Sequence, residues 1–439
     1  MKTIMEPSRE IPVIIETDVL VVGGGSAGMS AAVTASRMGC NVTLIEKFGF
    51  LGGTLTSVTL GSFCGIFTVT DEAIKPVVKG FQEELIERLK RYEGVLPPHR
   101  WLKTASVSYD ISCLKKVADE LITESGVCVF YHTQAVSVVK ENKKVKGVII
   151  ENKDGRSIIN AKVIIDASGD GDIAAMGGAP YEIGSNGITQ FPSSMFRMAN
   201  VEIEKIVHIT RDEYQGYFQK AKKDGYSLPR VSSGIHITPL YGVVHLNVTK
   251  IAREDGNTIN PLRVEELTYA EIEGRRQVFL YAEVLRKYVP GFEKARVVDI
   301  GSHIGIREAR LIKGDYILNE KDVLSCRKFD DVIACSAWPL EMHGEKDETK
   351  WVWIEPGDFY TIPYRCLIPQ NIENVLIAGR NISTTHEAQA STRVSAVCMA
   401  VGQAAGTAAY LALKCDNNVR DISIKELQGF LQKGNAFLG

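Results

Sequence analysis

The sequence predicts an α/β fold in which one sheet is assembled from both ends of the chain. An apolar strand, a glycine-rich turn, a helix and a second apolar strand follow one another over residues 17–46. A strand runs into a glycine again over residues 374–380, and the composition changes over the stretch between. We therefore expect a discontinuous Rossmann-like domain over residues 1–179 and 360–439, with an inserted mixed α/β domain over residues 180–359.

The first turn carries the spacing G-x-G-x-x-G, formed by Gly23, Gly25 and Gly28. Gly23 permits the tight turn, and Gly25 lets the backbone approach a pyrophosphate. Gly28 lets the helix pack closely on the strand. Glycine clusters mark many ordinary turns, but here strand, turn, helix and strand arrive in the order that a βαβ unit requires.

A pyrophosphate at this turn would meet free N–H groups at the start of the helix, where the helix dipole favours an anion. We therefore expect contacts from Ser26 and Ala27. Glu46 ends the second apolar run, where a carboxylate can accept hydrogen bonds from ribose hydroxyls, and Lys47 follows it. The unit predicts a site for an adenine dinucleotide.

Short strands and amphipathic helices complete the predicted first domain. The predicted helices are about Pro76–Tyr92, Ser112–Glu124 and Thr392–Lys414, and the predicted strands are Val127–Tyr131, Ala135–Val139, Val145–Glu151, Ser157–Ile159, Ala161–Asp166 and Asn374–Arg380.

The middle of the chain mixes polar helices with β-rich segments. Strands are predicted over Ile188–Ala199 and Ile235–Val248, with helices over about Ile203–Lys223 and Glu265–Tyr288. Leu340–Asp358 is polar and carries Trp351 and Trp353. We interpret it as a long loop, favouring a surface insertion over a lid above a site.

Composition excludes several classes of function. The net charge is −2 with scattered basic residues, so a nucleic-acid partner is not expected. The nine cysteines form no C-x-x-C pair, which favours reduced thiols in a cytoplasm and gives no metal ligand set. We expect no signal peptide and no membrane span. A homo-oligomer is left open.

Strand-plus-glycine units at both ends of the chain are unusual for a nicotinamide dehydrogenase, and the chain has no second G-x-G-x-x-G. The chain resembles the FAD-dependent oxidoreductase family of the glutathione-reductase-like flavoproteins, near the fumarate reductase and succinate dehydrogenase branch. The resemblance covers nearly the whole chain, and it rests on the joint order of these segments: Val22–Met29, Leu51–Thr54, Ile165–Asp172, Gly305–Arg310, Ile377–Glu387 and Gly402–Gly406.

The resemblance implies FAD as the cofactor. It places the loop Gly52-Gly53-Thr54 beside the isoalloxazine, and the turn 166–170 beside the phosphate and ribityl region. It places Gly379 and the start of the last long helix beside the ribityl chain and the flavin pyrimidine. The further residues expected to contact FAD are Ala135, Ala167, Ser168, Gly169, Asp170, Arg380 and Val394. Covalent relatives carry a flavin-linking histidine near Thr54, where this chain has none, so FAD is expected to bind non-covalently.

For the substrate, the resemblance implies a histidine- and arginine-bearing loop that contacts a carboxylate. His386 is the leading candidate for substrate hydrogen bonding or proton exchange, with a neutral histidine that only braces the loop as the alternative. Arg393 is expected to contact an anion, at a spacing that differs from the family pattern.

A second polar cluster follows Gly305. Arg307 suits a carboxylate clamp, although an internal ion pair of Arg307 or Arg310 with Glu308 or another acid is at least as well supported. His303 is a weaker candidate. Cys64 is interpreted as a buried spectator thiol.

The expected activity is hydride transfer between flavin N5 and a small polar or anionic organic molecule, with an unidentified electron donor or acceptor. Three alternatives stay open: a flavin monooxygenase or hydroxylase, a protein that uses FAD as a scaffold, and an RNA-modifying flavoprotein, which the absence of a basic face disfavours.

Overall fold

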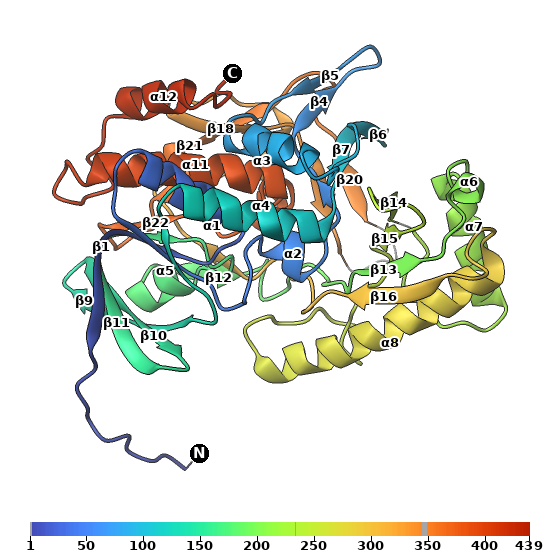
Figure 1. Ribbon diagram of the computed structural model, residues 1–439, viewed down its shortest axis with the longest axis horizontal. Helices are drawn as coiled ribbons and strands as arrows, with labels where there is room; N and C mark the ends of the chain where they lie inside the picture. Colours follow the sequence, from blue (N-terminus) through green and yellow to red (C-terminus); the bar gives the residue numbers. More distant parts are fainter. Residues whose placement is uncertain (1, 233, 345–348) are drawn as a thin grey trace.

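A central sheet organises the computed structural model, which describes residues 2–232, 234–344 and 349–439. The strands run in the order β8-β2-β1-β11-β10-β9, and β22 also pairs with β11. Figure 1 shows this sheet on the side of the molecule where the chain begins. Its strands are β1 (Val13–Val22), β2 (Val42–Ile45), β8 (Cys128–Phe130), β9 (Gln134–Glu141), β10 (Lys144–Asn152), β11 (Gly155–Asp166) and β22 (Val375–Ile377).

Strands β8, β2, β1, β11 and β22 pair in parallel, whereas β9 and β10 add an antiparallel ribbon. Parallel strands need both faces covered, and Val19, Leu20 and Val21 of β1 are fully buried. Strand β1 begins at Val13, earlier than the apolar run predicts, because its first half pairs with the N-terminal part of β11.

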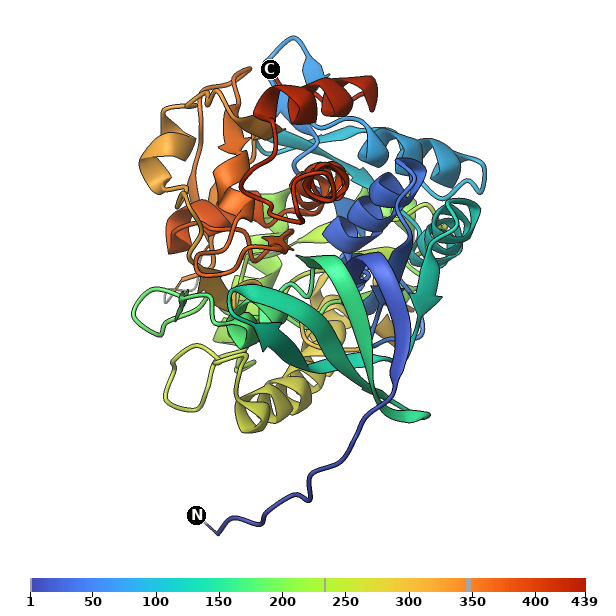
Figure 2. The same cartoon turned by 90° about the vertical axis from the view of Figure 1, so that its left-hand side faces the viewer.

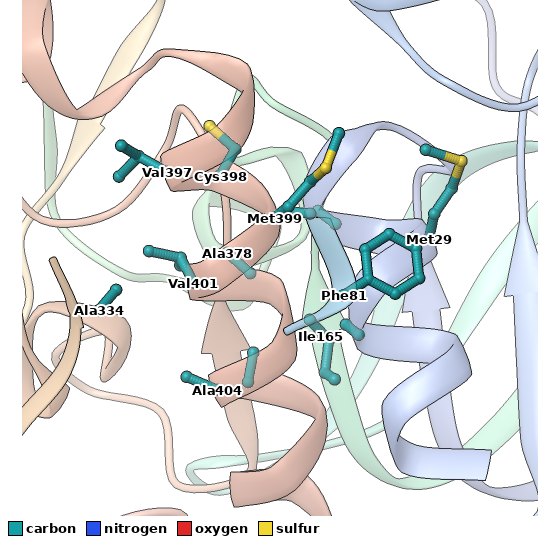
Figure 3. Packing of buried hydrophobic residues seen from close by; sticks show 14 of the residues in the cluster. Met29, Phe81, Ile165, Ala334, Ala378, Val397, Cys398, Met399, Val401 and Ala404 are labelled. Atoms are coloured by element: carbon teal, nitrogen blue, oxygen red, sulfur yellow. The ribbon is translucent and has the colours of Figure 1, made fainter. Parts of the chain in front are cut away.

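The two ends of the chain meet in this sheet and in the helices that cover it. Strand β22 pairs with the last residues of β11, and α11 (Ser395–Ala412) packs along α1 (Ser26–Arg37). Figure 2 shows α1 and α11 side by side above the sheet, and Figure 3 shows Met399 of α11 close to Met29 of α1 and to Phe81. The predicted assembly of one fold from both chain ends is found.

Gly402 and Gly406 allow this close packing. A Cβ atom on Gly402 would lie 2.2 Å from the carbonyl oxygen of Ala27, and one on Gly406 would lie 2.4 Å from that of Ala31. The Ser30 hydroxyl donates to the Met399 carbonyl at 2.7 Å. Larger side chains at these glycines would force the helices apart.

Several shorter elements complete this part of the molecule. The helices are α2 (Thr54–Ser57), α3 (Phe81–Lys90), α4 (Ile111–Glu124), α5 (Asp172–Gly177), α9 (Glu320–Leu324), α10 (His386–Thr392), α12 (Ile424–Lys433) and the short turn η1 (Tyr364–Leu367). The strands are β3 (Ser62–Phe63), β4 (Phe67–Val69), β5 (Ile74–Pro76), β6 (His99–Trp101), β7 (Thr104–Ser108), β12 (Tyr181–Ile183), β17 (Arg310–Ile312), β18 (Val332–Ser336) and β21 (Tyr360–Pro363).

Two predicted helices differ in extent. The helix predicted from Pro76 begins at Phe81, because Ile74–Pro76 pairs with β4 and Gly80 takes a φ of +71° before the helix. The helix predicted over Thr392–Lys414 is α11, which begins at Ser395 and ends at Ala412, because Val394 is extended and Thr392 ends the preceding helix α10. Helix α11 alone among the described residues has the length and hydropathy to cross a membrane, and 89% of it is buried inside the protein.

A second sheet and core lie beside the first. The strands run in the order β14-β15-β13-β16, and α7 and α8 cover the sheet, α8 along the lower edge of Figure 1. The elements are β13 (Phe196–Ala199), α6 (Ile203–Ile206), α7 (Arg211–Lys223), β14 (Ile235–Ile237), β15 (Val244–Leu246), α8 (Val264–Tyr288) and β16 (Arg296–Ile300).

Three predictions in this region are corrected. Of the strand predicted over Ile188–Ala199, only Phe196–Ala199 forms a strand, β13. The segment Ile235–Val248 is a hairpin rather than one strand, because it turns after Thr238. The helix predicted over Ile203–Lys223 is two helices, and Thr210 caps the second through a hydrogen bond from the Glu213 amide.

The segment Leu340–Asp358 is not a plain loop. It contains a hairpin of β19 (Leu340–Met342) and β20 (Lys350–Val352), whose tip, residues 345–348, lies outside the described residues. Leu318, Ile333 and Leu340 belong to the core that contains α1, α11 and one face of the first sheet, not to the core of the second sheet. Part of the segment predicted for the inserted domain therefore packs in the first core. The domain boundaries themselves stay a prediction.

Candidate active site

One cavity of about 420 Å³ lies between the first sheet and the second. Its walls come from the glycine turn after β1, the turn after β11, the start of α11, the hairpin β14–β15 and the hairpin β19–β20. Residues from both chain ends and from the middle of the chain therefore share one site.

The three glycines of the first turn have different structural roles. Gly23 has a φ of +98°, and a Cβ there would lie 2.5 Å from the Ala167 carbonyl oxygen. A Cβ on Gly28 would lie 1.8 Å from the Gly23 carbonyl oxygen, so Gly28 serves helix packing. At Gly25 the nearest atom would be Gly53 Cα at 3.6 Å, an ordinary contact. Gly25 therefore keeps open space at the cavity wall.

Two helices begin at the cavity without a side-chain cap. Helix α1 follows Gly25, and α11 follows Val394; neither residue before the helix makes a side-chain cap hydrogen bond. Gly25, Ser26, Val394 and Ser395 all line the cavity. The first N–H groups of a helix have no partner inside the helix, and the dipole makes this end positive. The site therefore offers two places for negative charge.

Glu46 holds the entry loop of the cavity. Its carboxylate accepts hydrogen bonds from the Gly24 amide at 2.7 Å and from the Phe48 amide at 2.9 Å. Burial raises the pKa of Glu46 although both amides lower it. A carboxylate has about four acceptor positions, so Glu46 can still accept from a hydroxyl donor.

The turn after β11 is held by a buried carboxylate. Asp166 accepts from the Ser168 hydroxyl at 2.6 Å and from the Ala174 amide at 2.8 Å. Burial raises the pKa of Asp166 to about 6. Next in the turn, Asp170 forms an ion pair with Arg380 at 2.6 Å, which joins this turn to the one after β22.

The cavity brings together all but three of the residues predicted to contact FAD. Those that line it are Gly23, Gly25, Ser26, Ala27, Glu46, Lys47, Gly53, Thr54, Ala167, Ser168, Gly169, Asp170, Gly379, Arg380 and Val394. Gly28 packs α1 on the strand, Gly52 donates its amide to the Gly24 carbonyl at 2.9 Å, and Ala135 pairs with Ile150 in the β-ribbon. The FAD contacts themselves stay predictions.

Three arginines line the far end of the cavity: Arg230 and Arg307 are buried, and Arg393 is half-buried. Arg230 donates to the Asn247 carbonyl at 3.3 Å, and Arg307 donates to the Asn247 side-chain oxygen at 3.5 Å. Arg393 donates to the Glu341 carbonyl at 3.1 Å. Burial, together with the charges of Arg393 and Arg230, lowers the pKa of Arg307 to about 9. The guanidinium groups repel one another here, so this end attracts an anion.

Glu341 is the carboxylate beside these arginines. It accepts from Trp338 Nε1 at 3.2 Å, and its other oxygen lies 3.1 Å from His343 Nε2. Burial opposes ionisation of Glu341, but His343 and the charges of Arg393 and Arg307 lower its pKa to about 2. Burial and Arg307 lower the pKa of His343 well below its usual value, so a neutral His343 donates to an ionised Glu341.

Aromatic rings form another wall of this end. The centroids of Trp101 and Trp351 are 5.4 Å apart, and those of Trp101 and His236 are 6.0 Å apart. His236 stands opposite His245 in the β14–β15 register. Burial lowers the pKa of His236 to about 4, and burial also lowers that of His245, so both rings are neutral.

The interpretation of Leu340–Asp358 as a surface insertion is wrong. Glu341, His343 and Trp351 of this segment line the cavity, because the hairpin folds inward and places Trp351 opposite Glu341. The sequence shows the two tryptophans but not the pairing that turns one of them toward the site.

His386 lies elsewhere than the resemblance implies. It begins helix α10 rather than lying in a loop, and its Nδ1 is 2.8 Å from the buried Glu308 carboxylate. Among the described residues that line the cavity, His386 is absent. This contact favours a bracing role, although Glu308 outweighs burial and raises the pKa of His386, which favours the charged ring rather than the neutral one of that alternative. A catalytic role for His386 stays a prediction.

The two arginines of the cluster after Gly305 have different surroundings, because Glu308 pairs with His386 rather than with either of them. Arg310 pairs with Asp172 at 2.7 Å. Arg307 faces the cavity instead. His303 also lines the cavity, stacked on Phe48 with centroids 5.3 Å apart.

The His386–Glu308 pair makes stability depend on pH. Burial lowers the pKa of His386, but the hydrogen bond and charge of Glu308 outweigh burial and raise it overall. The pair therefore contributes stability that is complete below about pH 6.5 and is lost as pH rises through the higher folded-state pKa. We expect His386→Gln to flatten this decline in unfolding midpoints measured against pH. An unchanged slope would show that the pair does not titrate in this way.

Sequence reasoning missed several cavity residues: Trp101, Arg230, His236, His245, Glu341 and His343. A signal existed for two of them. A turn near Gly242 in the segment Ile235–Val248 would have placed His236 opposite His245. Within the described residues, no group of three histidine, cysteine or acidic side chains could hold a metal ion.

Several cavity residues hold buried polar atoms that have no partner among the described residues. They are Trp351 Nε1, Arg380 Nη1, Arg393 Nε, Ser395 Oγ and both ring nitrogens of His245. Buried polar groups are nearly always hydrogen-bonded in folded proteins. Other such atoms lie away from the cavity, but those in its wall would find hydrogen-bond partners on a polar ligand.

Comparison with known proteins gives a family and a fold. The family model described as "FAD dependent oxidoreductase" matches residues 18–431. Thiamine thiazole synthase of Pyrococcus horikoshii is 24% identical over 249 residues, 55% of this chain and 88% of that protein. Cinnamate reductase of Clostridium sporogenes is 30% identical over 152 residues, 34% of this chain and 19% of that protein.

The first curated relatives match over only about 8% of their own length. Among solved structures, a geranylgeranyl bacteriochlorophyll reductase-like protein of Thermoplasma acidophilum superposes with a TM-score of 0.50. It shares 14% identity, over 96% of this chain and 84% of that one, which shows a shared fold.

Proposed function

Because the chain belongs to the FAD-dependent oxidoreductase family and is therefore an FAD-dependent enzyme, we propose that it transfers a hydride between FAD and a small anionic organic substrate. FAD supplies the two-electron chemistry when it is bound. One observation carries the proposal: a single cavity joins the glycine turn and two uncapped helix N-termini to three arginines, two of them buried.

The residues present fit FAD. Gly25 leaves space at the wall, and the amides at the start of α1 would bind a pyrophosphate. Glu46 has acceptor positions left for ribose hydroxyls. The amides at the start of α11 would stabilise negative charge on the ring system.

At the other end, Arg307, Arg230 and Arg393 would bind the negative group of the substrate. Glu341 keeps Arg393 in place, and the ring of His343 holds Glu341. Cys64 also lines the cavity, but burial raises the pKa of its thiol to about 12, so it stays protonated and acts as a spectator.

The relatives named as reductases, including urocanate reductase of Eggerthella lenta over 38 residues, support placing the chain near the fumarate-reductase-like branch. In this proposal a separate electron donor or acceptor restores the flavin. We also propose that the enzyme acts in the cytoplasm, without nucleic acid or membrane.

The purified protein is expected to be yellow, or to become yellow with excess FAD, and to bleach and recover as a reductant and then an oxidant are added without oxygen. A panel of organic anions then identifies the substrate class by bleaching or reoxidising the flavin. Bound FAD that cannot be reduced and reoxidised would contradict the proposal and favour a scaffold role. Rapid reaction of the reduced protein with oxygen, with hydroxylation of an added compound, would favour a monooxygenase.

A further inference from the structure

We propose that the substrate is a carboxylic acid carrying an aromatic ring, with the carboxylate bound between Arg230 and Arg307 and the ring against Trp101 and Trp351. This inference rests on the proposed function and deepens it. It is carried by two hairpins that place rings beside the same pair of arginines.

Among the described residues, neither Arg230 nor Arg307 forms a salt bridge with a carboxylate. Arg307 donates to the Phe191 carbonyl at 2.5 Å and to Asn247, and Arg230 donates to Ser232 Oγ at 2.7 Å and to Asn247. These are neutral acceptors. The nearby carboxylate of Glu341 lies 3.7 Å from Arg393. Burial lowers the pKa of Arg230 and Arg307, and the charge of Glu341 opposes this effect without a direct contact to either. Burying charge without a directly paired counter-ion is costly, so an anionic ligand would add that direct partner.

The hairpin β14–β15 ties this pair to one set of rings. Asn247, which contacts both arginines, follows His245 by two positions, and side chains two apart in extended chain lie on the same face. His245 stands opposite His236, whose ring lies beside Trp101. The carboxylate end is therefore next to a neutral aromatic wall.

The hairpin β19–β20 also connects an arginine of this pair to aromatic rings. Arg230 Nη2 donates to Thr349 Oγ1 at 3.4 Å, and Trp351 follows Thr349 by two positions. Trp351 also contacts the rings of Trp101 and Trp338, with centroids 5.4 and 6.1 Å away. A flat ring is the shape that this wall accommodates, because aromatic rings gain from stacked or edge contacts.

The wall distinguishes an aromatic acid from an aliphatic diacid. A second carboxylate in the place of the ring would meet the neutral rings of Trp101, Trp351 and His236. That second carboxylate would lose its hydration there without gaining contact with a positively charged side chain. We therefore expect one negative group and one ring.

The test uses the FAD-loaded protein and calorimetric titration with four probes: 3-phenylpropanoate, its neutral amide, 3-cyclohexylpropanoate and succinate. We expect the aromatic acid to bind best. The amide should bind about 10- to 100-fold more weakly, since it loses a charge-assisted contact. The cyclohexyl acid should bind several-fold more weakly, since it loses the ring contacts. Equal binding of acid and amide, or tighter binding of succinate, would overturn the inference.

Variants locate the two halves of the site. Arg307→Met should weaken the acid by about 10-fold or more and leave the amide nearly unchanged. The matched control is Arg310→Met, three positions along and paired with Asp172 outside the cavity lining. Trp101→Leu should remove the preference for phenyl over cyclohexyl. If Arg307→Met fails to fold, Arg307→Lys is measured in its place. The four probes on the unchanged protein also test the inference without any variant.

Flavin content separates this inference from the proposed function. Protein that binds FAD and cycles between its oxidation states, yet takes up no aromatic acid, contradicts the inference alone. Protein that never binds FAD contradicts the proposed function, whatever it does with the acids.

Discussion

Replacing Gly25 with valine is expected to give a folded protein that no longer takes up FAD. A Cβ at Gly25 meets only Gly53 Cα at 3.6 Å, so the protein itself accepts the first added carbon. The side chain would project where Gly25 lines the cavity, at the uncapped start of α1. Because a pyrophosphate must approach that backbone closely, we expect FAD affinity to fall on the order of 100-fold or more.

The measurement is the ratio of flavin to protein after incubation with excess FAD, together with the thermal unfolding midpoint of the protein without FAD. Gly216→Val is the control, since Gly216 lies in α7 with no atom within 4 Å of an added Cβ. The control should stay fully loaded. A Gly25→Val protein that is isolated yellow with full flavin content would show that the pyrophosphate lies elsewhere.

The nucleotide side of the site follows from sequence because its signals are local. The turn glycines, the acid Glu46 and the turn after Asp166 each lie directly after a buried parallel strand. The ends of parallel strands meet at one edge of the sheet, so the residues that follow them are brought together. Most of the residues predicted for FAD therefore line one cavity.

The substrate side does not follow in the same way. Glu341 and Trp351 reach the cavity through the hairpin β19–β20, and His236 and His245 through β14–β15; the turns that fix these pairings have weak sequence signals. Arg230 comes from the irregular segment before β14. Strand register decides which side chains face inward, and a shift of one residue would reverse every side chain. His386 illustrates a related difficulty, since its contact with the buried Glu308 is not visible in the sequence and its catalytic role stays a prediction.

The predicted element boundaries differ from the structure where local backbone geometry, rather than the spacing of apolar residues, decides where a helix begins. Gly80, with a φ of +71°, lies directly before the start of α3, so the helix begins after it rather than at Pro76. Thr210 caps the start of α7 within a segment whose polar pattern is continuous. Both residues are helix-start signals that a search for apolar spacing passes over.

The packing of α1 on α11 leads to the second large effect: we expect Gly402→Ala to destabilise the fold by about 1–3 kcal/mol. The added Cβ would lie 2.2 Å from the Ala27 carbonyl oxygen, and backbone on both sides leaves no flexible side chain to move aside. Urea unfolding of the protein without FAD would measure the loss.

Gly429→Ala provides a control with the opposite sign. Gly429 lies inside α12, and an added Cβ there meets no atom within 4 Å. Alanine favours a helix over glycine by roughly 0.5–1 kcal/mol, so this variant should be more stable than the starting protein. Equal effects of the two substitutions would contradict the close approach of α1 and α11.

Gly402→Ala should also weaken FAD binding, because Ala27 belongs to the first turn of α1 and lines the cavity. Separating α1 from α11 at this level moves apart the two helix starts that face the site. Gly406→Ala, whose Cβ would lie 2.4 Å from the Ala31 carbonyl oxygen one turn further on, should cost similar stability with a smaller loss of FAD affinity. A loss of FAD affinity that is equal in the two variants would mean that overall destabilisation, rather than the position of the helix starts, controls cofactor binding.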